Sequence, residues 1–292
     1  MVFMKKTILL VMLLSMICAG QGRAQVGLKL LTAEAGARAV GMGGAFSAVP
    51  ADPYSAAYNP AATWGINTVE GSFGHNTYWE NIRIETGYMS FYKRATVVTA
   101  GVQFASIDNI EGRIAPTEDF YEFAAHDVSI KVGAAFELEP KYILGFSLGW
   151  MYEKIDVDAG SAFNFDLGLL MQPSPDLNIG LAVQNFGSTM KLRDESYDIP
   201  TTYRGGISYI YHDFMPSLDV VLLDSDYYFH FGGEYNLNDK FFLRAGYRVG
   251  YDTKDISAGA GFVRRNFRID YAYLPFKSGL TDSHLINLTF EI

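Results

Sequence analysis

The sequence predicts an all-β fold: a transmembrane, antiparallel, up-and-down β-barrel of about 14 strands with an N-terminal hatch segment inside its lumen. Three observations predict this fold. Aromatic residues make up 15% of the chain and glycine is frequent, which favours strands over helices. Apolar and polar residues alternate with a period of two in one segment after another. The connections after even-numbered segments are short, and the two longest connections follow odd-numbered segments.

The first 24 residues have the layout of a secretory signal peptide. Lys5 and Lys6 precede an apolar run from residue 7 to 18, and small residues then lead to Gln25. An apolar run of about a dozen residues is too short to span a bilayer, which needs about 20. We therefore expect cleavage of residues 1–24 and delivery of the mature chain to the outer membrane of a Gram-negative-type bacterium. Residues 25–67 are the expected hatch and residues 68–292 the expected barrel.

The segments after residue 67 alternate in the manner of strands. In KYILGFSLGWMYEK, residues 141–154, Leu144, Phe146 and Leu148 share one face, and Gly145 and Ser147 lie on the other. No segment after about residue 71 shows a helical stripe. The predicted strands are 68–78, 82–93, 95–106, 125–138, 141–154, 160–171, 176–186, 201–212, 215–224, 226–237, 240–251, 254–264, 265–275 and 283–292.

The connections between the predicted strands separate by length. Bacterial membrane barrels have short turns on the periplasmic side and longer loops outside. The turns after even-numbered strands are short, and the two longest connections, 107–124 and 187–200, follow odd-numbered strands. A soluble β-sandwich has no reason to sort its loops in this way. The short turns are 93–94, 139–140, 172–175, 213–214, 238–239 and 264–265.

The two faces of the strands have the polarity of a membrane barrel. One face of each strand is almost wholly apolar, and the other holds the charged residues. An apolar outer face and a polar lumen are the inverse of a soluble protein. A secreted β-sandwich or propeller is the alternative that this inversion disfavours. The residues expected to face inward are Arg83, Glu85, Lys131, Asp166, Arg204, Glu234, Arg244, Arg248, Arg268 and Asp270.

The segment before the first strand is rich in glycine and alanine. About fourteen strands enclose a lumen too wide for side chains alone to fill, so this segment is expected to plug it. Its glycines do not have the spacing of a dinucleotide-binding or phosphate-binding loop, and no Lys-Ser/Thr pair follows them. A lone charge inside a barrel is costly, so we expect Arg38 to pair with a wall carboxylate such as Glu234.

The inward charges of the last strands are expected to form a cross-strand ion-pair network that stiffens the wall and anchors the hatch. The residues of this expected network are Glu234, Arg244, Arg248, Arg268 and Asp270.

Several functional classes are disfavoured by composition. The net charge of −9 and the lack of a basic cluster disfavour a nucleic-acid partner. No His or carboxylate cluster has the spacing of metal ligands, and no cofactor is expected. The nearest approach to hydrolase chemistry is Ser283, His284 and Asn287, which we attribute to chance. We therefore expect a protein that is not an enzyme.

The run GARAVGMGGAFSAVPADPYSAAYNPAA, residues 36–62, resembles the N-terminal signature of the PorV/PorQ family of outer-membrane proteins. Segments 182–187, 202–209, 232–248 and 259–276 are also similar to that family. The usual acidic pair is Asp-Pro here, and the Trp of Tyr-Trp-Asn-Pro is absent. The resemblance implies a FadL-like barrel of fourteen strands with a hatch. The hatch-motif residues it indicates are Gly36, Arg38, Gly41, Gly43, Gly44, Phe46, Asp52, Tyr58, Asn59 and Pro60.

The resemblance implies an accessory or cargo-handling role in type IX protein secretion, with secreted cargo proteins or secretion-system components as partners beside the outer-membrane lipid. The alternative is FadL-like passage of hydrophobic small molecules. Transport requires an apolar pocket beside the hatch and a gap in the wall, whereas cargo docking requires apolar, ordered external loops. The expected external loop at 108–123 carries Phe120, Tyr121 and Phe123 and suits either role.

Overall fold

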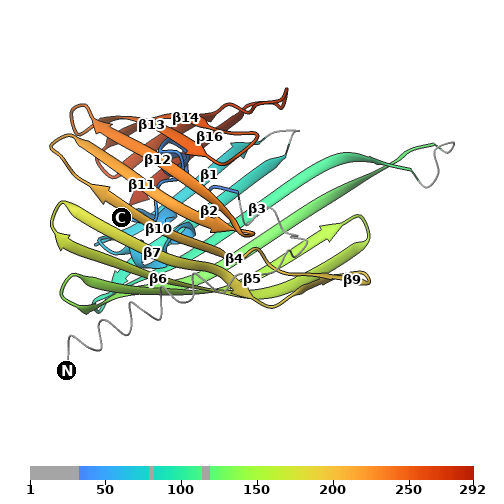
Figure 1. Cartoon of the computed structure of the whole chain (residues 1–292), viewed down its shortest axis with the longest axis horizontal. Coiled ribbons are helices and arrows are strands. Elements are labelled where there is room, and N and C mark those ends of the chain that lie inside the picture. The colour runs from blue at the N-terminus through green and yellow to red at the C-terminus, as the bar shows by residue number, and fades with distance from the viewer. Residues whose placement is uncertain (1–32, 79–81, 114–118) are drawn as a thin grey trace.

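The computed structural model describes residues 33–78, 82–113 and 119–292. Fourteen antiparallel strands close into a single barrel, with the first strand paired to the last (Figure 1). The fold class predicted from the sequence is confirmed. The predicted signal peptide, residues 1–24, lies outside the described residues, as do the first residues of the predicted hatch.

The barrel strands follow one another around the wall in chain order, and β7 pairs directly with β10. The short strands β8 (Met190–Leu192) and β9 (Glu195–Tyr197) form a separate hairpin within the connection between β7 and β10. The barrel strands are β1 (Val69–Thr77), β2 (Arg83–Lys93), β3 (Thr96–Gly112), β4 (Tyr121–Glu139), β5 (Tyr142–Ile155), β6 (Asp158–Ser174), β7 (Leu177–Gly187), β10 (Thr202–Tyr209), β11 (Phe214–Leu223), β12 (Asp226–Asn236), β13 (Phe241–Val249), β14 (Ile256–Arg264), β15 (Phe267–Leu274) and β16 (Ser283–Glu291).

The longest connections all lie at one end of the barrel, as predicted, although that end also holds the two-residue turns after β5 and β11. The turns after β2, β4, β6, β10, β12 and β14 lie at one end, which we call the short-turn end, and the other connections lie at the long-loop end. Residues 108–112 and 121–123 of the expected loop 108–123 belong to strands: a bulge between Ile107 and Ile110 lets the β3–β4 ladder continue to Gly112 and Tyr121. The rings of Tyr121 and Phe123, 5.9 Å apart, therefore belong to β4, on the hairpin that projects furthest in Figure 1.

The outer face is apolar, as expected. Large side chains such as Phe73 and Leu148 are 65% and 61% exposed. The prediction that Arg83 and Glu85 face inward is wrong, because Ile84 between them packs against the buried Ala105. Neighbouring residues of a strand point to opposite faces, so a buried Ile84 turns both charged residues outward. There Arg83 pairs with Asp108 and Glu85 with His75.

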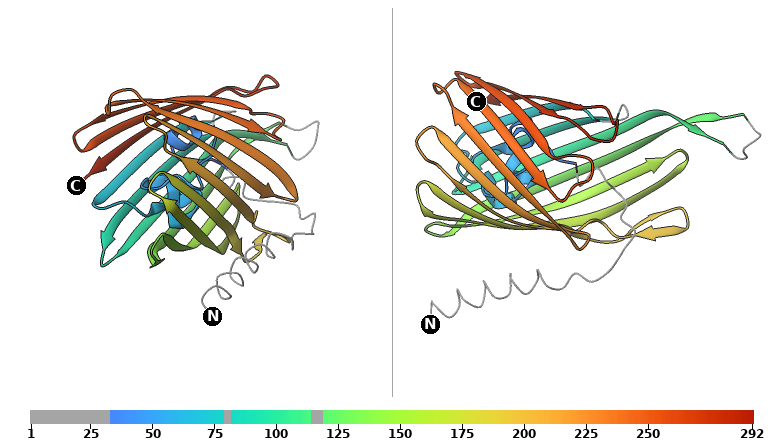
Figure 2. Two further views of the ribbon diagram at one scale, coloured as in Figure 1. Left: turned by 60° about the vertical axis from the view of Figure 1, so that its left-hand side comes forward. Right: turned by 45° about the horizontal axis from the view of Figure 1, so that its top comes forward.

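The hatch consists of short helical turns inside the barrel (Figure 2). The helix α2 (Ala37–Gly41) lies against β13–β16, and the 3-10 turn η3 (Pro60–Thr63) lies against β4–β7. A second 3-10 turn, η2 (Pro53–Ala57), lies against β1–β3. Both 3-10 turns begin with proline after an Asp or Asn whose side chain accepts a backbone N–H bond, at 3.0 Å in each case.

Among residues 33–78, 82–113 and 119–292, no helix is long and apolar enough to cross a membrane.

Candidate functional site

The hatch backbone contacts the barrel wall at glycines. A methyl group added to Gly246, Gly145 or Gly180 would lie well under 3.0 Å from backbone atoms of the hatch. Side chains are therefore excluded at these points, and backbone packs directly on backbone. Gly43 and Gly44 of the hatch have φ angles of 68° and 71°, a left-handed conformation that glycine adopts at little cost. Small residues thus let the hatch and the wall approach closely.

Six charged side chains form a closed ring that joins the hatch to the wall. Positive and negative groups alternate around it, and the nitrogen-to-oxygen distances are 2.7, 2.6, 2.8, 2.8, 2.7 and 3.3 Å. The ring carries no net charge, because three guanidinium groups balance three carboxylates. In order, its members are Arg38, Glu234, Arg244, Asp270, Arg268 and Asp52.

The expected pairing of Arg38 with Glu234 is confirmed. Its Nε and Nη2 donate to the two carboxylate oxygens at 2.8 and 2.7 Å, a bidentate geometry. Asp52 is the second hatch residue of the ring. Burial alone would raise the pKa of Asp52, but the charges of Arg268 and Arg38 outweigh burial and lower it. The Asp52 carboxylate therefore keeps its negative charge between these two arginines.

Arg248 belongs to a second ion group, not to the ring. It lies four residues beyond Arg244 along β13, about 13 Å further toward the long-loop end, and there it meets Glu34 of the hatch. Its Nη2 lies 2.5 Å from the Glu34 carboxylate and also donates to the carbonyl of Val40 at 3.2 Å. Lys254 lies 3.5 Å from the same carboxylate. The expected single network is thus divided into two groups along the barrel.

The remaining motif residues set the internal shape of the hatch. The rings of Phe46 and Tyr58 meet edge to face at 5.5 Å, and the Tyr58 hydroxyl donates to the carbonyl of Ala35 at 2.8 Å. The Asn59 amide donates to the carbonyls of Ser47 at 2.9 Å and Leu169 at 3.1 Å, while Pro60 begins η3. Gly36 has φ 85° and touches the Tyr54 ring, and Gly41 approaches Gly259.

Asp219 was not singled out from the sequence. Its carboxylate accepts the backbone N–H groups of Phe46 and Ser47 at 3.2 and 3.0 Å and is fully buried. Its inward place in the alternating pattern of β11 is a signal that could have revealed it.

Acid is expected to weaken the second ion group. Burial alone would raise the pKa of Glu34, but the charges of Arg248 and Lys254 outweigh it and hold that pKa well below its usual range. Because the folded value is depressed, the stabilisation is complete above the usual carboxyl pKa of about 4.3 and is lost as the pH falls further. We expect faster hydrogen exchange of the hatch amides at about pH 3 than at about pH 6, after correction for intrinsic rates. Equal protection at both values would contradict this expectation.

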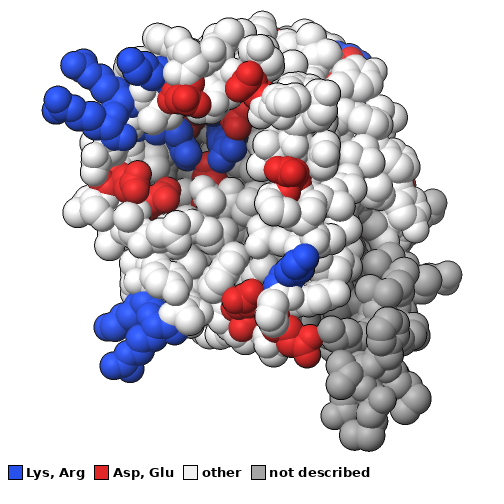
Figure 3. Space-filling view, turned by 90° about the vertical axis from the view of Figure 1, so that its left-hand side faces the viewer, with Lys and Arg blue, Asp and Glu red and all other residues white. Residues whose placement is uncertain are grey.

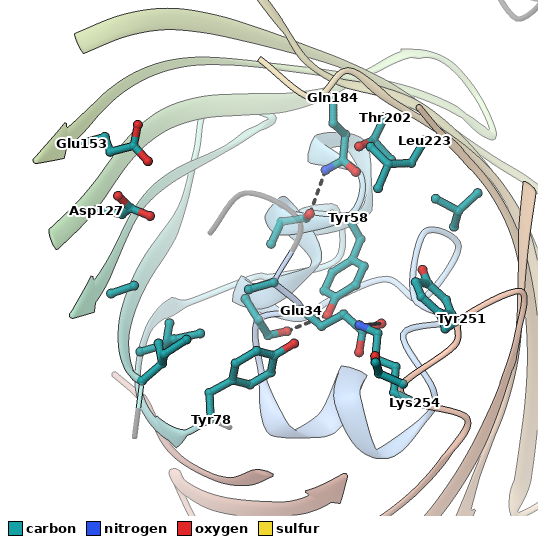
Figure 4. Close-up of a pocket in the computed structure, with 18 of the residues that line it drawn as sticks. Glu34, Tyr58, Tyr78, Asp127, Glu153, Gln184, Thr202, Leu223, Tyr251 and Lys254 are labelled. Atoms are coloured by element: carbon teal, nitrogen blue, oxygen red, sulfur yellow. Dashed lines mark hydrogen bonds and ion pairs between the residues drawn. The ribbon is translucent and has the colours of Figure 1, made fainter. Parts of the chain in front are cut away.

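A cavity of about 480 Å³ lies on the long-loop side of the hatch (Figure 4). Glu34 and Tyr58 of the hatch line it, and residues of the strands and of the connections at the long-loop end form much of the remaining lining. Isoleucines, alanines and tyrosines supply much of the surface, with polar groups between them. The barrel wall beside it is closed, because all fourteen strands pair with both neighbours. The wall gap expected for transport is therefore not present among the described strands.

The ion ring lies near the short-turn end of the barrel and is partly exposed there. Viewed from this end, the molecule shows charged side chains around and inside a hollow (Figure 3). Glu234 lies two residues before the end of β12, and Arg268 is the second residue of β15, so the ion ring is near this end. Arg38 and Arg268 remain 16% and 19% exposed. The hatch thus separates the large cavity from the short-turn end.

The residues considered for hydrolase chemistry do not converge. Ser283 faces inward and donates to the Asn76 side chain at 2.7 Å, whereas His284 faces outward and bonds the Tyr271 hydroxyl at 2.8 Å. Asn287 faces inward and accepts the N–H of Ala37 at 2.6 Å. Within the part of the chain that the structure describes, no group of three or more His, Cys, Asp or Glu residues could hold a metal ion.

Comparisons with known proteins establish the fold. The toluene transporter TodX of Pseudomonas putida superposes with a TM-score of 0.67 at 12% identity, over 88% of this chain and 98% of that one. A FadL homologue from Pseudomonas aeruginosa gives a TM-score of 0.65 at 12% identity, over 87% and 98% of the two chains. No protein-family model and no curated protein matches the sequence. The chain thus has the FadL-type fold, and the PorV/PorQ assignment finds no support.

Proposed function

We propose that this protein is an outer-membrane channel for hydrophobic small molecules, with the cavity beside the hatch as its binding site. The cavity itself carries the proposal: about 480 Å³ of space inside a membrane barrel, lined largely by apolar and aromatic groups. The exposed apolar wall suits residence in a bilayer, with lipid as the partner of that surface. The similar fold of a toluene transporter supports this reading.

The secretion role implied by the PorV/PorQ resemblance is not the function we propose. Neither the fold comparisons nor a family match supports it. Of the aromatic residues suggested for docking cargo, Phe120 and Tyr121 are 49% and 45% exposed, and Tyr121 and Phe123 lie within a strand. The exposure and position of these three residues do not indicate what kind of protein would bind them.

The described conformation corresponds to a sealed channel. The wall is closed and the hatch is fixed by the ion ring and by backbone contacts. A solute that enters the cavity therefore crosses only when the hatch shifts. Movement of a plug held by ion pairs is a transition between two discrete packings, not a gradual widening.

Filling the cavity is expected to reduce solute uptake strongly. Ala125 of β4 lines the cavity, so Ala125→Trp places an indole in the space that a solute would occupy. We expect toluene uptake into outer-membrane vesicles to fall at least about tenfold, the loss caused by about 1.4 kcal/mol of steric conflict. The matched control is Val132→Trp on the same strand, whose side chain is 53% exposed on the outer face. Equal uptake by both variants and wild type, or by vesicles lacking the protein, contradicts the proposed function.

A further inference from the structure

We infer that the cavity accepts amphipathic cations, in particular hydrophobic amines, whose ammonium group binds between Asp127 and Glu153. This inference rests on the proposed function and names the class of solute that the cavity selects. Both carboxylates line the cavity, on the side opposite Tyr251 and Lys254 (Figure 4).

The two carboxylates are held side by side by the sheet. Asp127 of β4 and Glu153 of β5 are direct register partners, so both point into the lumen. Side chains at such positions have Cβ atoms about 5 Å apart. Like charges at directly opposite positions repel each other, and burial adds to the cost. Glu153 is only 9% exposed, so solvent offsets little of this repulsion.

The pair lacks a protein cation. Among the described residues, no Lys, Arg or His nitrogen lies within 4 Å of either carboxylate as an ion pair. The Tyr197 hydroxyl donates to Glu153 and orients it without neutralising it. Six other carboxylates of the lumen each have a basic partner: Glu34, Asp52, Asp166, Asp219, Glu234 and Asp270. The charge missing from this part of the cavity is therefore positive.

The surroundings of the pair are apolar and fit the tail of an amphiphile. Ile84, Ala105, Ile107, Ala125 and Ile155 line the same cavity from β2–β5. An ammonium group between the carboxylates can donate to both and offsets one of their two negative charges, while an alkyl chain along these side chains buries apolar area.

The basic side chains of the cavity do not favour an acid in the same way. Lys254 lies 3.5 Å from Glu34, and Arg204 lies 3.9 Å from Asp219 while its Nε donates to Gln184 at 2.9 Å. A carboxylate ligand would compete with these existing partners and would also face the acidic pair. A neutral hydrocarbon would leave the acidic pair without a counter-charge. The amine is the class that matches both the charge and the shape.

Three ligands with the same six-carbon chain and different head groups distinguish binding of an amine, a neutral molecule and an acid. The full-length protein in lipid nanodiscs would be titrated calorimetrically at neutral pH with n-hexylammonium, n-hexanol and n-hexanoate, with heats from empty nanodiscs subtracted. We expect hexylammonium to bind about tenfold tighter than hexanol, because it adds a charge-assisted hydrogen bond, and hexanoate to bind most weakly. Equal affinities for the amine and the alcohol would overturn the inference.

Two variants link the preference to the carboxylates. Asp127→Asn combined with Glu153→Gln should reduce the affinity for hexylammonium to that for hexanol and leave hexanol binding unchanged. Glu122→Gln, on the exposed outer part of β4, is the control and should change neither. An amine preference that survives the double substitution refutes the site, and the wild-type ligand series remains decisive if the variant does not fold. If hexanol also fails to bind, the proposed function fails; if hexanol binds and the amine has no advantage, only this inference fails.

Discussion

Arg38→Ala is expected to release the hatch and to raise the conductance of the protein in planar bilayers. Arg38 is the one Lys or Arg between residues 33 and 68, and it holds two carboxylates of the ion ring. Its removal leaves three carboxylates against two guanidinium groups, so the ring gains a net negative charge inside the barrel. The guanidinium also lies 5.6 Å from the Phe46 ring centroid, a cation–π contact that is lost with it.

The size of this effect follows from the burial of the pair. Breaking a buried ion pair by removing one partner costs about 3–5 kcal/mol. The lower end applies here, because Glu234 keeps Arg244 and Asp52 keeps Arg268. A cost of about 3 kcal/mol shifts the balance between seated and released hatch by about a hundredfold.

The control for Arg38→Ala is Arg193→Ala. Arg193 also forms an ion pair, at 3.6 Å from Asp158, but its side chain is 74% exposed and such pairs contribute little. The conductance of the Arg193→Ala variant should equal that of wild type. Unchanged conductance for Arg38→Ala would show that the ring does not hold the hatch closed.

The strand pattern could be predicted because it follows a local rule. In β5, Leu144, Phe146 and Leu148 alternate with small or polar residues, and the structure places the two sets on opposite faces. The pairing of Arg38 with Glu234 could also be anticipated, since a lone charge in a lumen requires a partner. Both inferences need only the identity of the residues and the two-residue period of a strand.

Other features depend on register and could not be predicted from periodicity alone. Closure of the ring through Arg268 and Asp52 requires two segments 216 residues apart to meet. The separation of Arg248 from the ring depends on how far along β13 the hatch lies. The outward orientation of Arg83 and Glu85 is set by the burial of Ile84, which their own charges do not reveal. Their charge alone predicts that they face the lumen, whereas the packing of Ile84 turns both to the outer face.

Gly246→Val is expected to prevent the hatch from seating while the barrel still folds. A Cβ atom on Gly246 would lie well under 3.0 Å from the backbone of Gly43, and neither backbone can give way as a flexible side chain could. Gly246 is in the middle of β13, where valine is a favourable strand residue, so the wall itself tolerates the change. The conflict is therefore confined to the contact between hatch and wall.

Trypsin provides a direct measurement of the hatch in this variant. Arg38 is paired within the ion ring inside the barrel when the hatch is seated, so cleavage after it requires release of the segment. We expect rapid cleavage at Arg38 in Gly246→Val and slow cleavage in wild type, with heat-modifiable migration on gels showing that both barrels are folded. Gly71→Val is the matched control, because a Cβ atom there meets nothing within 4 Å. Slow cleavage in Gly246→Val would mean that the hatch reseats elsewhere, and the backbone contact would then not determine its position.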